Sequence, residues 1–409
     1  MSGSAGYTDS QGSVVSDLTI NPVSEALSGW ELDVVVSGSI GAVESVKFIR
    51  SLRRLGSKIT PWLTRGGAEF ITSQALSWAA AQDTITSFSG TASHIAVRHG
   101  CIVAPASASL IAKIAHGQTD TPASALIASY LGEKKPVMLL PNMHDSLYRS
   151  PAIQENLKKI QSYGVKILGA RTEEGKQKFP SPDTLADLCA NELHVHKSGS
   201  KGRVLITMGT TRGYIDDVRY ISNYSSGALG TAISHELYRH GFETIVICGP
   251  CTVKPTVATK MIDIESNADM EQAIKDAEKG ALHAAVLAAS VLDFIPNSRQ
   301  SGKIRSDSNA GLTLELSPSK KLIKDVKSNI KVGFKLETGL TSEAASQFAK
   351  DYTSKYNLSL FVINDLADVS ATKHRAKIFN RDGKEFRSVE SKGGIANAIC
   401  QHILCNGRD

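Results

Sequence analysis

The stretch of residues 204–230 constrains the fold of this chain more than any other part of the sequence. It begins with V-L-I-T, a short apolar run typical of a buried parallel strand. A polar turn at residues 209–212 follows, and Ser225 and Ser226 then open a helical pattern for which serine is the expected N-cap. Unpaired N–H groups and the helix dipole at such a turn favour phosphate or carboxylate. The same pattern also fits a crossover that binds no ligand, and it lacks the G-x-G-x-x-G of dinucleotide sites.

Short apolar runs alternate with helical patterns along most of the chain, which predicts an α/β protein with parallel sheets covered by helices. At 409 residues the chain is too long for one compact core. We therefore expect two doubly wound, Rossmann-like domains. The predicted boundaries are a flexible tail at residues 1–30, a first domain at 31–193, a polar linker at 194–202 and a second domain at 203–409.

The expected elements follow from the same periodicities. In the first domain they are strands at residues 32–36, 58–63, 101–104, 136–140 and 165–168, and helices near 43–52, 107–115, 122–132 and 151–163. In the second domain they are strands at 204–207, 244–248, 284–288, 332–333 and 359–363, smaller strands at 312–316 and 376–379, and helices near 226–240, 267–280, 342–356 and 393–404.

The composition, 41% hydrophobic and 21% charged, is that of a soluble globular protein. The net charge of +6 is not gathered into long basic runs, so nucleic acid is not indicated, whereas small anionic substrates are compatible with this charge. No apolar run reaches the ~18 residues of a membrane-spanning helix, and the first 30 residues lack the pattern of a signal peptide. We interpret the six cysteines as scattered, without C-x-x-C pairs or nearby histidine partners, and this interpretation disfavours a zinc site or a disulfide framework and favours the reducing cytoplasm.

The motif I-S-N-Y-S-S-G-A-L-G at residues 221–230, preceded by T-R-G-Y-I-D, resembles the ligase half of a known family. This is the bifunctional phosphopantothenoylcysteine decarboxylase/phosphopantothenate–cysteine ligase family of coenzyme A biosynthesis. The resemblance covers about residues 33–404. It implies a homo-oligomer with a flavodoxin-like FMN domain followed by a ligase domain. It also implies a reaction that joins 4′-phosphopantothenate to cysteine with Mg²⁺ and CTP or ATP, through an acyl-nucleotide.

The resemblance assigns roles to residues of the second domain. Asn223 would stabilise the acyl-nucleotide as charge develops on it, and Lys303 in G-K-I would meet the triphosphate. Without the surrounding motifs, Asn223 would be a turn residue and Lys303 a solvated lysine. Ser225 and Ser226 would bind substrate. The implied nucleotide-binding residues are Gly209, Asp293, Lys303, Phe334 and Lys355, of which Asp293 is the candidate Mg²⁺ ligand.

The motifs G-S-I, S-H-I, A-P-A-S-A-S-L-I-A-K and P-A-I-Q-E-N-L of the first domain resemble flavin-dependent cysteine decarboxylases. His94 falls on the family's catalytic histidine, and imidazole suits proton transfer because its pKa lies near neutrality. Outside this context it would be a loop histidine that caps a helix. Asn142 and His144 would bind substrate. The implied FMN-binding residues are Gly38, Ser39, Ile40, Thr64, Ser107 and Ser109.

Three departures from the family pattern affect this domain. The family's A-N-T reads Ala108-Ser109-Leu110, and His144 replaces an asparagine. The substrate-clamp region at 171–176 lacks the family's cysteine, and Cys189 lies in a core-like helical pattern. These departures predict an impaired decarboxylase and leave open a ligase whose first domain only binds flavin or supports assembly. A dinucleotide or nucleotide-sugar oxidoreductase is disfavoured because G-x-G-x-x-G and a Tyr-x-x-x-Lys pair are absent.

Overall fold

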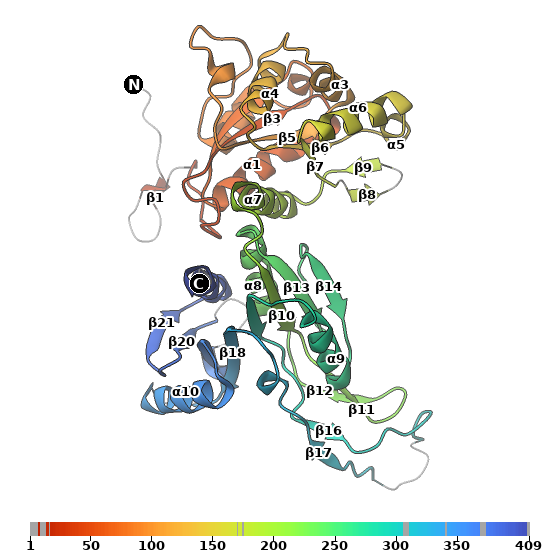
Figure 1. Ribbon diagram of the computed structural model, residues 1–409, viewed down its shortest axis with the longest axis vertical. Coiled ribbons are helices and arrows are strands. Elements are labelled where there is room, and N and C mark those ends of the chain that lie inside the picture. The colour runs from red at the N-terminus through yellow and green to blue at the C-terminus, as the bar shows by residue number, and fades with distance from the viewer. Residues whose placement is uncertain are drawn as a thin grey trace. The chain divides into compact units, whose positions relative to one another are not determined.

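The computed structural model describes residues 7–8, 14–15, 17–169, 171–173, 176–305, 311–339, 342–368 and 374–406. The chain divides into two compact units, Met1–Lys197 and Ser198–Asp409 (Figure 1). Helix α7 (Pro182–Ser198) closes the first unit. It continues through residues 194–198, so the first half of the predicted linker is helical. His194 Nε2 lies 2.7 Å from the carbonyl of Ala26, a contact that helps hold this last turn.

The first unit contains a five-stranded parallel sheet in the order β4-β3-β5-β6-β7. This is a flavodoxin-like order, as predicted. Its strands are β3 (Glu31–Val36), β4 (Lys58–Leu63), β5 (Gly100–Ala106), β6 (Val137–Pro141) and β7 (Lys166–Ile167). Two short antiparallel pairs are separate from it: β1 (Tyr7–Thr8) with β2 (Val14–Val15), and β8 (Arg171–Glu173) with β9 (Lys176–Lys178).

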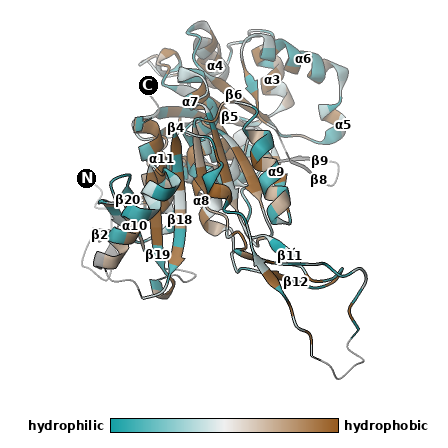
Figure 2. Cartoon of the chain, turned by 60° about the horizontal axis from the view of Figure 1, so that its bottom comes forward, coloured by the Kyte–Doolittle hydropathy of each residue, from teal (hydrophilic) through white to brown (hydrophobic). Residues whose placement is uncertain are grey.

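Helices cover both faces of this sheet, and β3 is therefore buried on both sides. Leu32 and Val34 pack toward α1 and α7, whereas Val35 packs with residues of α3, α4 and α6. Figure 2 shows the hydrophilic outer sides of α3 and α6. The remaining helices are α1 (Ser45–Arg54), α2 (Ser73–Ala80), α3 (Ala108–Ala115), α4 (Pro122–Gly132), α5 (Asp145–Tyr148) and α6 (Pro151–Ser162).

The end of the predicted flexible tail is part of the core. Leu27 is fully buried, and its N–H donates to the carbonyl of Leu55 at 2.7 Å. Val23 N–H likewise donates to the carbonyl of Arg54 at 2.8 Å. The tail prediction was therefore wrong for residues 23–30. A few apolar residues in a Ser/Gly-rich segment did not reveal that they pack against α1.

The second unit is built on an eight-stranded sheet in the order β14-β13-β10-β15-β18-β19-β20-β21. The first six are parallel, and β20 and β21 add antiparallel at one edge. The strands are β10 (Arg203–Met208), β13 (Glu243–Cys248), β14 (Lys260–Asp263), β15 (Ala284–Leu287), β18 (Ile330–Glu337), β19 (Leu360–Asp365), β20 (Ala376–Asn380) and β21 (Glu385–Val389).

Alternate residues of β10 bury against helices on opposite faces of this sheet. Ile206 packs with α8 (Ala228–Arg239) and α11 (Lys392–Asn406), and Leu205 packs with α9 (Asn267–Ala277). Helix α10 (Ser342–Tyr356) covers β19, where Phe361 stacks on Tyr352. No helix in the described ranges is long and apolar enough to cross a membrane.

Two short hairpins extend beyond the carboxyl edge of this sheet (Figure 1). They are β11 (Arg212–Tyr214) with β12 (Tyr220–Ser222), and β16 (Phe294–Pro296) with β17 (Leu316–Pro318). The predicted strand at 312–316 was wrong, because residues 311–315 are irregular and only Leu316 begins β17. The three-residue strands of these hairpins are mostly exposed and carry no periodic apolar signal.

Candidate functional site

The strand order of the second unit reverses between β10 and β15, so a crevice is expected at their carboxyl ends. The turns that follow these strands are tied together there. Ser290 N–H donates to the carbonyl of Gly209 at 2.8 Å, and Leu292 N–H donates to the hydroxyl of Thr211 at 3.0 Å. Asn267 Nδ2 also donates to the carbonyl of Leu292 at 2.9 Å, and the Thr211 hydroxyl donates to Asn267 Oδ1.

Two glycines allow the turns after β10 and β13 to meet. Gly209 has φ +75°, and a Cβ built there would lie 2.4 Å from the carbonyl oxygen of Gly249. A Cβ on Gly249 would lie 1.8 Å from the carbonyl oxygen of Thr210. Neither position can carry a side chain without moving the backbone. Gly209 therefore shapes this turn, whatever it binds.

Asn223 follows β12 and reaches into this crevice. Its Nδ2 donates to the carbonyls of Ser290 at 3.4 Å and Val291 at 3.2 Å. The preceding Ser222 donates to the hydroxyl of Thr210 at 2.9 Å. The side chain of Asn223 is nevertheless exposed, so an incoming group can compete for its amide.

The N-terminus of α8 differs from the expected serine cap. Gly227 is the N-cap with φ +79°, and no side chain caps the helix. Ser225 and Ser226 instead accept long hydrogen bonds of 3.4 Å from the N–H groups of Gly227 and Ala228. The left-handed conformation favours glycine over serine at the cap. Both hydroxyls lie at the start of a helix, where anions are favoured.

Lys303 lies beside the turn that joins β11 to β12. Asp217 accepts from the N–H of Gly302 at 2.7 Å, and Asp216 accepts from the N–H of Ile304 at 3.1 Å. Arg219 Nη1 pairs with Asp216 at 2.7 Å and also donates to the carbonyl of Ile304 at 3.0 Å. The backbone on both sides of Lys303 is thus fixed by hydrogen bonds, while the side chain of Lys303 is exposed.

The side chain of Asp216 is fully buried in this turn. Burial alone would raise the pKa of the carboxyl, but the N–H groups of Arg219, Val218 and Ile304 and the Arg219 guanidinium lower that pKa to about 2. The carboxylate therefore stays ionised at any physiological pH. Asn223 lies at the base of the β11–β12 hairpin, and Lys303 lies near the tip of that hairpin. Within the described ranges, Asn223 and Lys303 therefore do not contact each other.

Asp293 ends the turn after β15 and forms an ion pair with Lys321. Its carbonyl accepts from the N–H of Ser319 at 2.8 Å, which holds the loop of residues 317–320 against this turn. Lys320 in the same loop pairs with Glu271 of α9 at 2.9 Å. Asp293 is exposed and would have to exchange Lys321 for a metal ion. No group of three or more His, Cys, Asp or Glu side chains suited to a metal occurs within the described residues.

The two remaining nucleotide-binding candidates lie at different edges of the sheet. Phe334 is half-buried in the middle of β18, one residue beyond Gly333, which pairs with Leu287 at the carboxyl end of β15. Lys355 lies in the last turn of α10, which leads into the amino end of β19. The fold therefore brings Phe334 toward the crevice and leaves Lys355 at the opposite edge.

In the first unit the strand order reverses between β3 and β5, and their carboxyl ends carry the expected flavin turns. Ser37 donates to the carbonyl of Pro105 at 2.9 Å and accepts from the N–H of Ser107 at 2.7 Å. Ser107 is the N-cap of α3. The Ser39 hydroxyl donates to Asn142 Oδ1, which also accepts from Gly41 N–H at 3.2 Å. Asn142 is buried and braces the first turn.

The other flavin candidates surround the same edge. A Cβ on Gly38 would lie 2.9 Å from the backbone of Gly66, and the hydroxyl of Thr64 accepts from the N–H of Gly67 at 3.1 Å. Ser109, in the first turn of α3, is exposed. Ile40 is 70% exposed, a large apolar side chain left uncovered beside these turns. Close backbone approach, helix N–H groups and an uncovered apolar surface together fit a phosphate attached to an aromatic ring system.

His94 lies in the short helical turn Ser93–Ile95. Its ring meets Phe88 edge-on, with centroids 5.1 Å apart. Its Nδ1 is buried and has no hydrogen-bond partner among the described residues. A buried nitrogen without a partner costs stability unless a ligand or another chain satisfies it. Within the described residues, no hydrogen bond or ring contact links His94 to the turns at 37–39 or 107.

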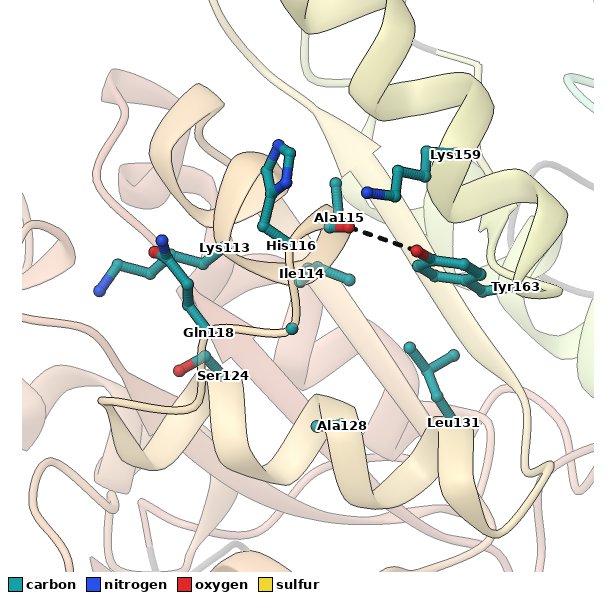
Figure 3. Close-up of a pocket in the computed structure, with 11 residues that line it drawn as sticks. Lys113, Ile114, Ala115, His116, Gln118, Ser124, Ala128, Leu131, Lys159 and Tyr163 are labelled. Atoms are coloured by element: carbon teal, nitrogen blue, oxygen red, sulfur yellow. Dashed lines mark hydrogen bonds between the residues drawn. The ribbon is translucent and has the colours of Figure 1, made fainter.

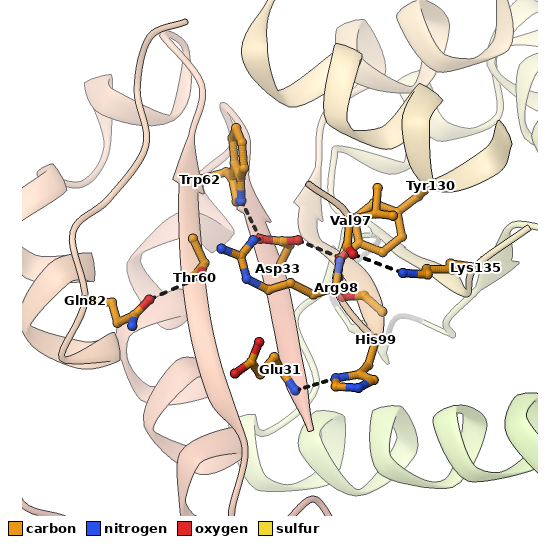
Figure 4. Close-up of polar contacts among 11 residues, drawn as sticks. Glu31, Asp33, Thr60, Trp62, Gln82, Val97, Arg98, His99, Tyr130 and Lys135 are labelled. Atoms are coloured by element: carbon orange, nitrogen blue, oxygen red, sulfur yellow. Dashed lines mark hydrogen bonds and ion pairs between the residues drawn. The ribbon is translucent and has the colours of Figure 1, made fainter. Parts of the chain in front are cut away.

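The segment after His94 is anchored to the sheet by Asp33, a buried acid in β3 (Figure 4). Arg98 Nη1, the Tyr130 hydroxyl and Trp62 Nε1 donate to its carboxylate at 2.5, 2.6 and 2.7 Å. Burial raises the pKa of Asp33, and these three partners oppose that rise. The cluster fixes where the loop carrying His94 enters β5.

The last candidate residue of the first unit, His144, caps the start of a helix. His144 is the N-cap of α5, and its Nδ1 accepts from Ser146 N–H at 3.3 Å.

In the clamp region, residues 174–175 lie outside the described residues. Cys189 is fully buried, as predicted, and Cys101 is buried in β5. Burial raises the pKa of both thiols.

Comparison with known proteins decides the family. The DNA/pantothenate metabolism flavoprotein C-terminal domain matches residues 200–405, and the flavoprotein family matches residues 20–194. The coenzyme A biosynthesis bifunctional protein CoaBC of Thermococcus kodakarensis is 34% identical over 392 residues, 93% of this chain and 96% of the relative. This chain belongs to the CoaBC family.

Two further similarities are at lower sequence identity. The protein of Methanocaldococcus jannaschii is 27% identical over 350 residues, 84% of this chain and 85% of the relative. The solved structure of the DNA/pantothenate metabolism flavoprotein from Streptococcus pneumoniae is 25% identical, with a TM-score of 0.46, and covers 50% of this chain and 99% of that chain.

Two cavities of this CoaBC chain lie away from both sets of turns. One, of about 410 Å³, lies between the carboxyl ends of α3 and α6, where Tyr163 donates to the carbonyl of Ala115 at 3.3 Å (Figure 3). Two lysines line it, Lys113 and Lys159, and Lys113 is paired with Asp120. The other, of about 800 Å³, lies at the amino ends of β10 and β18, beside Arg203 and Ile330. Both are at the edge opposite the crevices.

Several contributors to the CoaBC sites were missed from the sequence. Asp216 ends the quoted T-R-G-Y-I-D motif and Asp217 follows it, but nothing local links them to residues 88 and 85 positions later. Asn267 similarly reaches Leu292 from the first turn of α9. Of these contributors, only Asp33 could have been noticed in the sequence, because it is a charged residue inside the apolar run L-D-V-V-V.

Proposed function

We propose that the second unit joins the carboxylate of 4′-phosphopantothenate to the amine of cysteine. The carboxylate oxygen attacks the α-phosphorus of a nucleoside triphosphate, CTP or ATP, and diphosphate leaves. The cysteine amine then attacks the acyl carbon, and the nucleoside monophosphate leaves. This is one of the two activities of a bifunctional enzyme of coenzyme A biosynthesis; the other is FMN-dependent decarboxylation of the product.

The observation that carries the ligase proposal is the position of Asn223. Its amide bridges the two turns of the crevice through the carbonyls of Ser290 and Val291. These contacts hold the amide beside the crevice, where its N–H groups would be redirected over a short distance to the negative charge that develops on the acyl oxygen or the phosphate. Ser225 and Ser226, at the start of α8, would receive the phosphate of 4′-phosphopantothenate.

The nucleotide would lie across the turns after β10, β15 and β18. Lys303, held through Gly302 and Ile304, would meet the triphosphate with a flexible point charge. Asp293 fits a Mg²⁺ ion, which commonly takes one protein carboxylate together with phosphate oxygens and waters. The loop at 317–320 and Phe334 would contact the base, so they would decide between CTP and ATP.

The first unit would hold FMN by its phosphate at Gly38, Ser39 and Ser107. When bound, the flavin supplies a two-electron acceptor for the cysteinyl portion of the substrate. His94, whose Nδ1 has no hydrogen-bond partner in the described part of the chain, would exchange a proton with that portion. His144 retains its second ring nitrogen for substrate while Nδ1 caps α5.

We also propose that the enzyme is a homo-oligomer of the cytoplasm. Large apolar side chains are exposed on the two hairpins: Val218 at 60%, Tyr220 at 44%, Phe294 at 54% and Leu316 at 44%. A second copy of the chain would cover them. All six cysteines are free, which supports a reducing compartment. Sedimentation of the full chain tests the assembly.

The decisive experiment is product analysis by mass spectrometry. The full chain is incubated with 4′-phosphopantothenate, cysteine and either CTP or ATP, with and without FMN. We expect 4′-phosphopantothenoylcysteine and a nucleoside monophosphate without FMN. Diphosphate release that requires neither 4′-phosphopantothenate nor cysteine would contradict the ligase proposal.

A further inference from the structure

Cys248 and Cys251 form a close thiol pair in the second unit, so the interpretation of the cysteines as scattered without a C-x-x-C pair was wrong. They have C-x-x-C spacing in the sequence Cys248-Gly249-Pro250-Cys251. Their sulfur atoms lie 3.6 Å apart. Cys248 ends β13 and is fully buried, whereas Cys251 is half-buried in the loop that follows. One thiol is therefore accessible and its neighbour is shielded.

The loop between the two cysteines touches the residues that position Asn223. The carbonyl of Pro250 accepts from the N–H of Thr210 at 3.2 Å and from its hydroxyl at 3.3 Å. That hydroxyl accepts in turn from Ser222, the residue before Asn223. Movement of Pro250 is thus transmitted through two side chains to the turn after β12.

The loop after Cys251 touches the other part of the site, at the start of α8. Val253 N–H donates to the carbonyl of Ser226 at 2.9 Å, and the Thr252 hydroxyl donates to the same carbonyl at 3.3 Å. A Cβ built on Gly227 would lie 2.8 Å from Sγ of Cys251. The sulfur therefore packs directly on the helix cap that follows Ser225 and Ser226.

We propose that Cys248 and Cys251 are a thiol modification site, oxidised to an intrachain disulfide by low-molecular-weight disulfides, and that this disulfide slows the ligase reaction. The second claim, that the disulfide slows ligation, rests on the proposed function. Cystine is a low-molecular-weight disulfide, and it is the oxidised form of the free cysteine that the ligase consumes. The first claim depends only on the two thiols.

The chemistry is two successive thiol–disulfide exchanges. The thiolate of Cys251 attacks one sulfur of R–S–S–R, forming a mixed disulfide and expelling R–S⁻. The thiolate of Cys248 then attacks the Cys251 sulfur, and the second R–S⁻ leaves. The protein loses two electrons and two protons, and the small disulfide becomes two thiols. Cys248 acts second because it is buried, and burial together with Cys251 raises its pKa to about 12.

The disulfide changes geometry next to the site. The two sulfur atoms must approach from 3.6 Å to the ~2.05 Å of an S–S bond. Cys248 is fixed in the core at the end of β13, so Cys251 and the loop behind it have to move. Val253 and Pro250 move with that loop, and they hold Ser226 and Thr210. A misplacement of about 1 Å at a reacting centre can slow a reaction by about 10²-fold.

The test uses the full chain, treated with cystine, desalted, and compared with reduced protein. Peptide mapping by mass spectrometry should find Cys248 linked to Cys251, and hydrogen exchange should change at residues 222–228. Ligation should slow by about tenfold or more and recover with dithiothreitol. Failure to find the link, or a link with unchanged exchange and ligation, would overturn the proposal.

Two variants control this test. Cys251→Ser should ligate at the untreated rate and lose its sensitivity to cystine. Cys405→Ser removes an exposed thiol in α11 and should remain as sensitive as the unaltered protein. Cystine inhibition that persists in Cys251→Ser would overturn the proposal. If reduced protein does not ligate at all, the proposed function fails, while the mapped link and the exchange at 222–228 still decide the thiol site.

Discussion

The side-chain amide of Asn223 donates to the main-chain carbonyl of Val291 across 3.2 Å, and it thereby ties the turn after β12 to the turn after β15. The two residues are 68 positions apart in the sequence. A substitution that removes this contact should therefore affect both turns of the crevice.

Asn223→Asp should leave the fold intact and slow product formation by about 10²-fold or more. A carboxylate has no N–H to donate, and it would face the carbonyl oxygens of Ser290 and Val291. The rate of 4′-phosphopantothenoylcysteine formation measures the effect, and circular dichroism reports the fold. Asn329→Asp, the same exchange at an exposed position, should be neutral. Unchanged turnover of Asn223→Asp would remove Asn223 from the mechanism.

Lys303→Gln should prevent activation of the carboxylate, because glutamine keeps the polar tip but loses the charge that meets the triphosphate. We expect no acyl-nucleotide in single-turnover samples quenched with acid and read by mass spectrometry. Lys279→Gln alters an exposed lysine of the same unit and should leave the signal unchanged. Normal accumulation in Lys303→Gln would assign the triphosphate to another cation.

Acid should release the loop that carries Lys303. The folded pKa of Asp216 is about 2, below the ~3.9 of an unfolded aspartate. Its contribution to stability is therefore fully present above pH ~4 and is lost as the pH falls toward 2. Pepsin should cleave within residues 212–222 and 299–305 increasingly across this window.

Asp216→Asn should be cleaved there already at pH ~4, because an amide cannot replace the ionised acceptor. Asp382→Asn, at an exposed turn, should follow the unaltered protein. Cleavage that does not depend on Asp216 would show that the hairpin tip is held by other contacts.

Gly38→Ala should weaken FMN binding at least tenfold. The added methyl would lie 2.9 Å from the backbone of Gly66, so the turn after β3 must shift. Quenching of flavin fluorescence on titration measures the affinity. Gly132→Ala places the same methyl in open space at the end of α4 and should bind as before. Equal affinities would place the flavin elsewhere.

His94→Asn should retain flavin but abolish bleaching of its absorbance by 4′-phosphopantothenoylcysteine, because asparagine cannot exchange the proton. The unaltered chain should bleach and then turn over slowly, since Cys101 and Cys189 are both buried and their thiol pKa values are raised. Rapid multiple turnover to 4′-phosphopantetheine would show that another group replaces the clamp cysteine.

Strands buried on both faces could be predicted closely from sequence. β4 spans the predicted residues 58–63, and β13 differs from its prediction by one residue. Their apolar runs are local signals. The hairpins, the packed segment 23–30 and the helical residues 194–198 depend on partners distant in sequence, such as Ala26 for His194, and short local patterns do not encode them.

The same limit applied to the candidate sites. Motif residues such as Asn223 and Ser107 could be named in advance, but their partners could not. The bracing of Ser39 by Asn142 and of Gly302 by Asp217 arises from tertiary contacts between separate turns. The N-cap of α8 was misassigned because the left-handed backbone of Gly227 is set by its packing on the loop after β13.

The strand order has a consequence for how each unit is made on the ribosome. β3 and β10 are the first long strands of their units to be synthesised, yet each ends between two strands that follow it, β4 and β5 for the former and β13 and β15 for the latter. A nascent chain therefore keeps at least one edge of this apolar strand unpaired until about 70–80 further residues have emerged. We expect ribosome-bound chains that stop before β5 or β15 to need chaperone protection, although the finished sheets bury these strands completely.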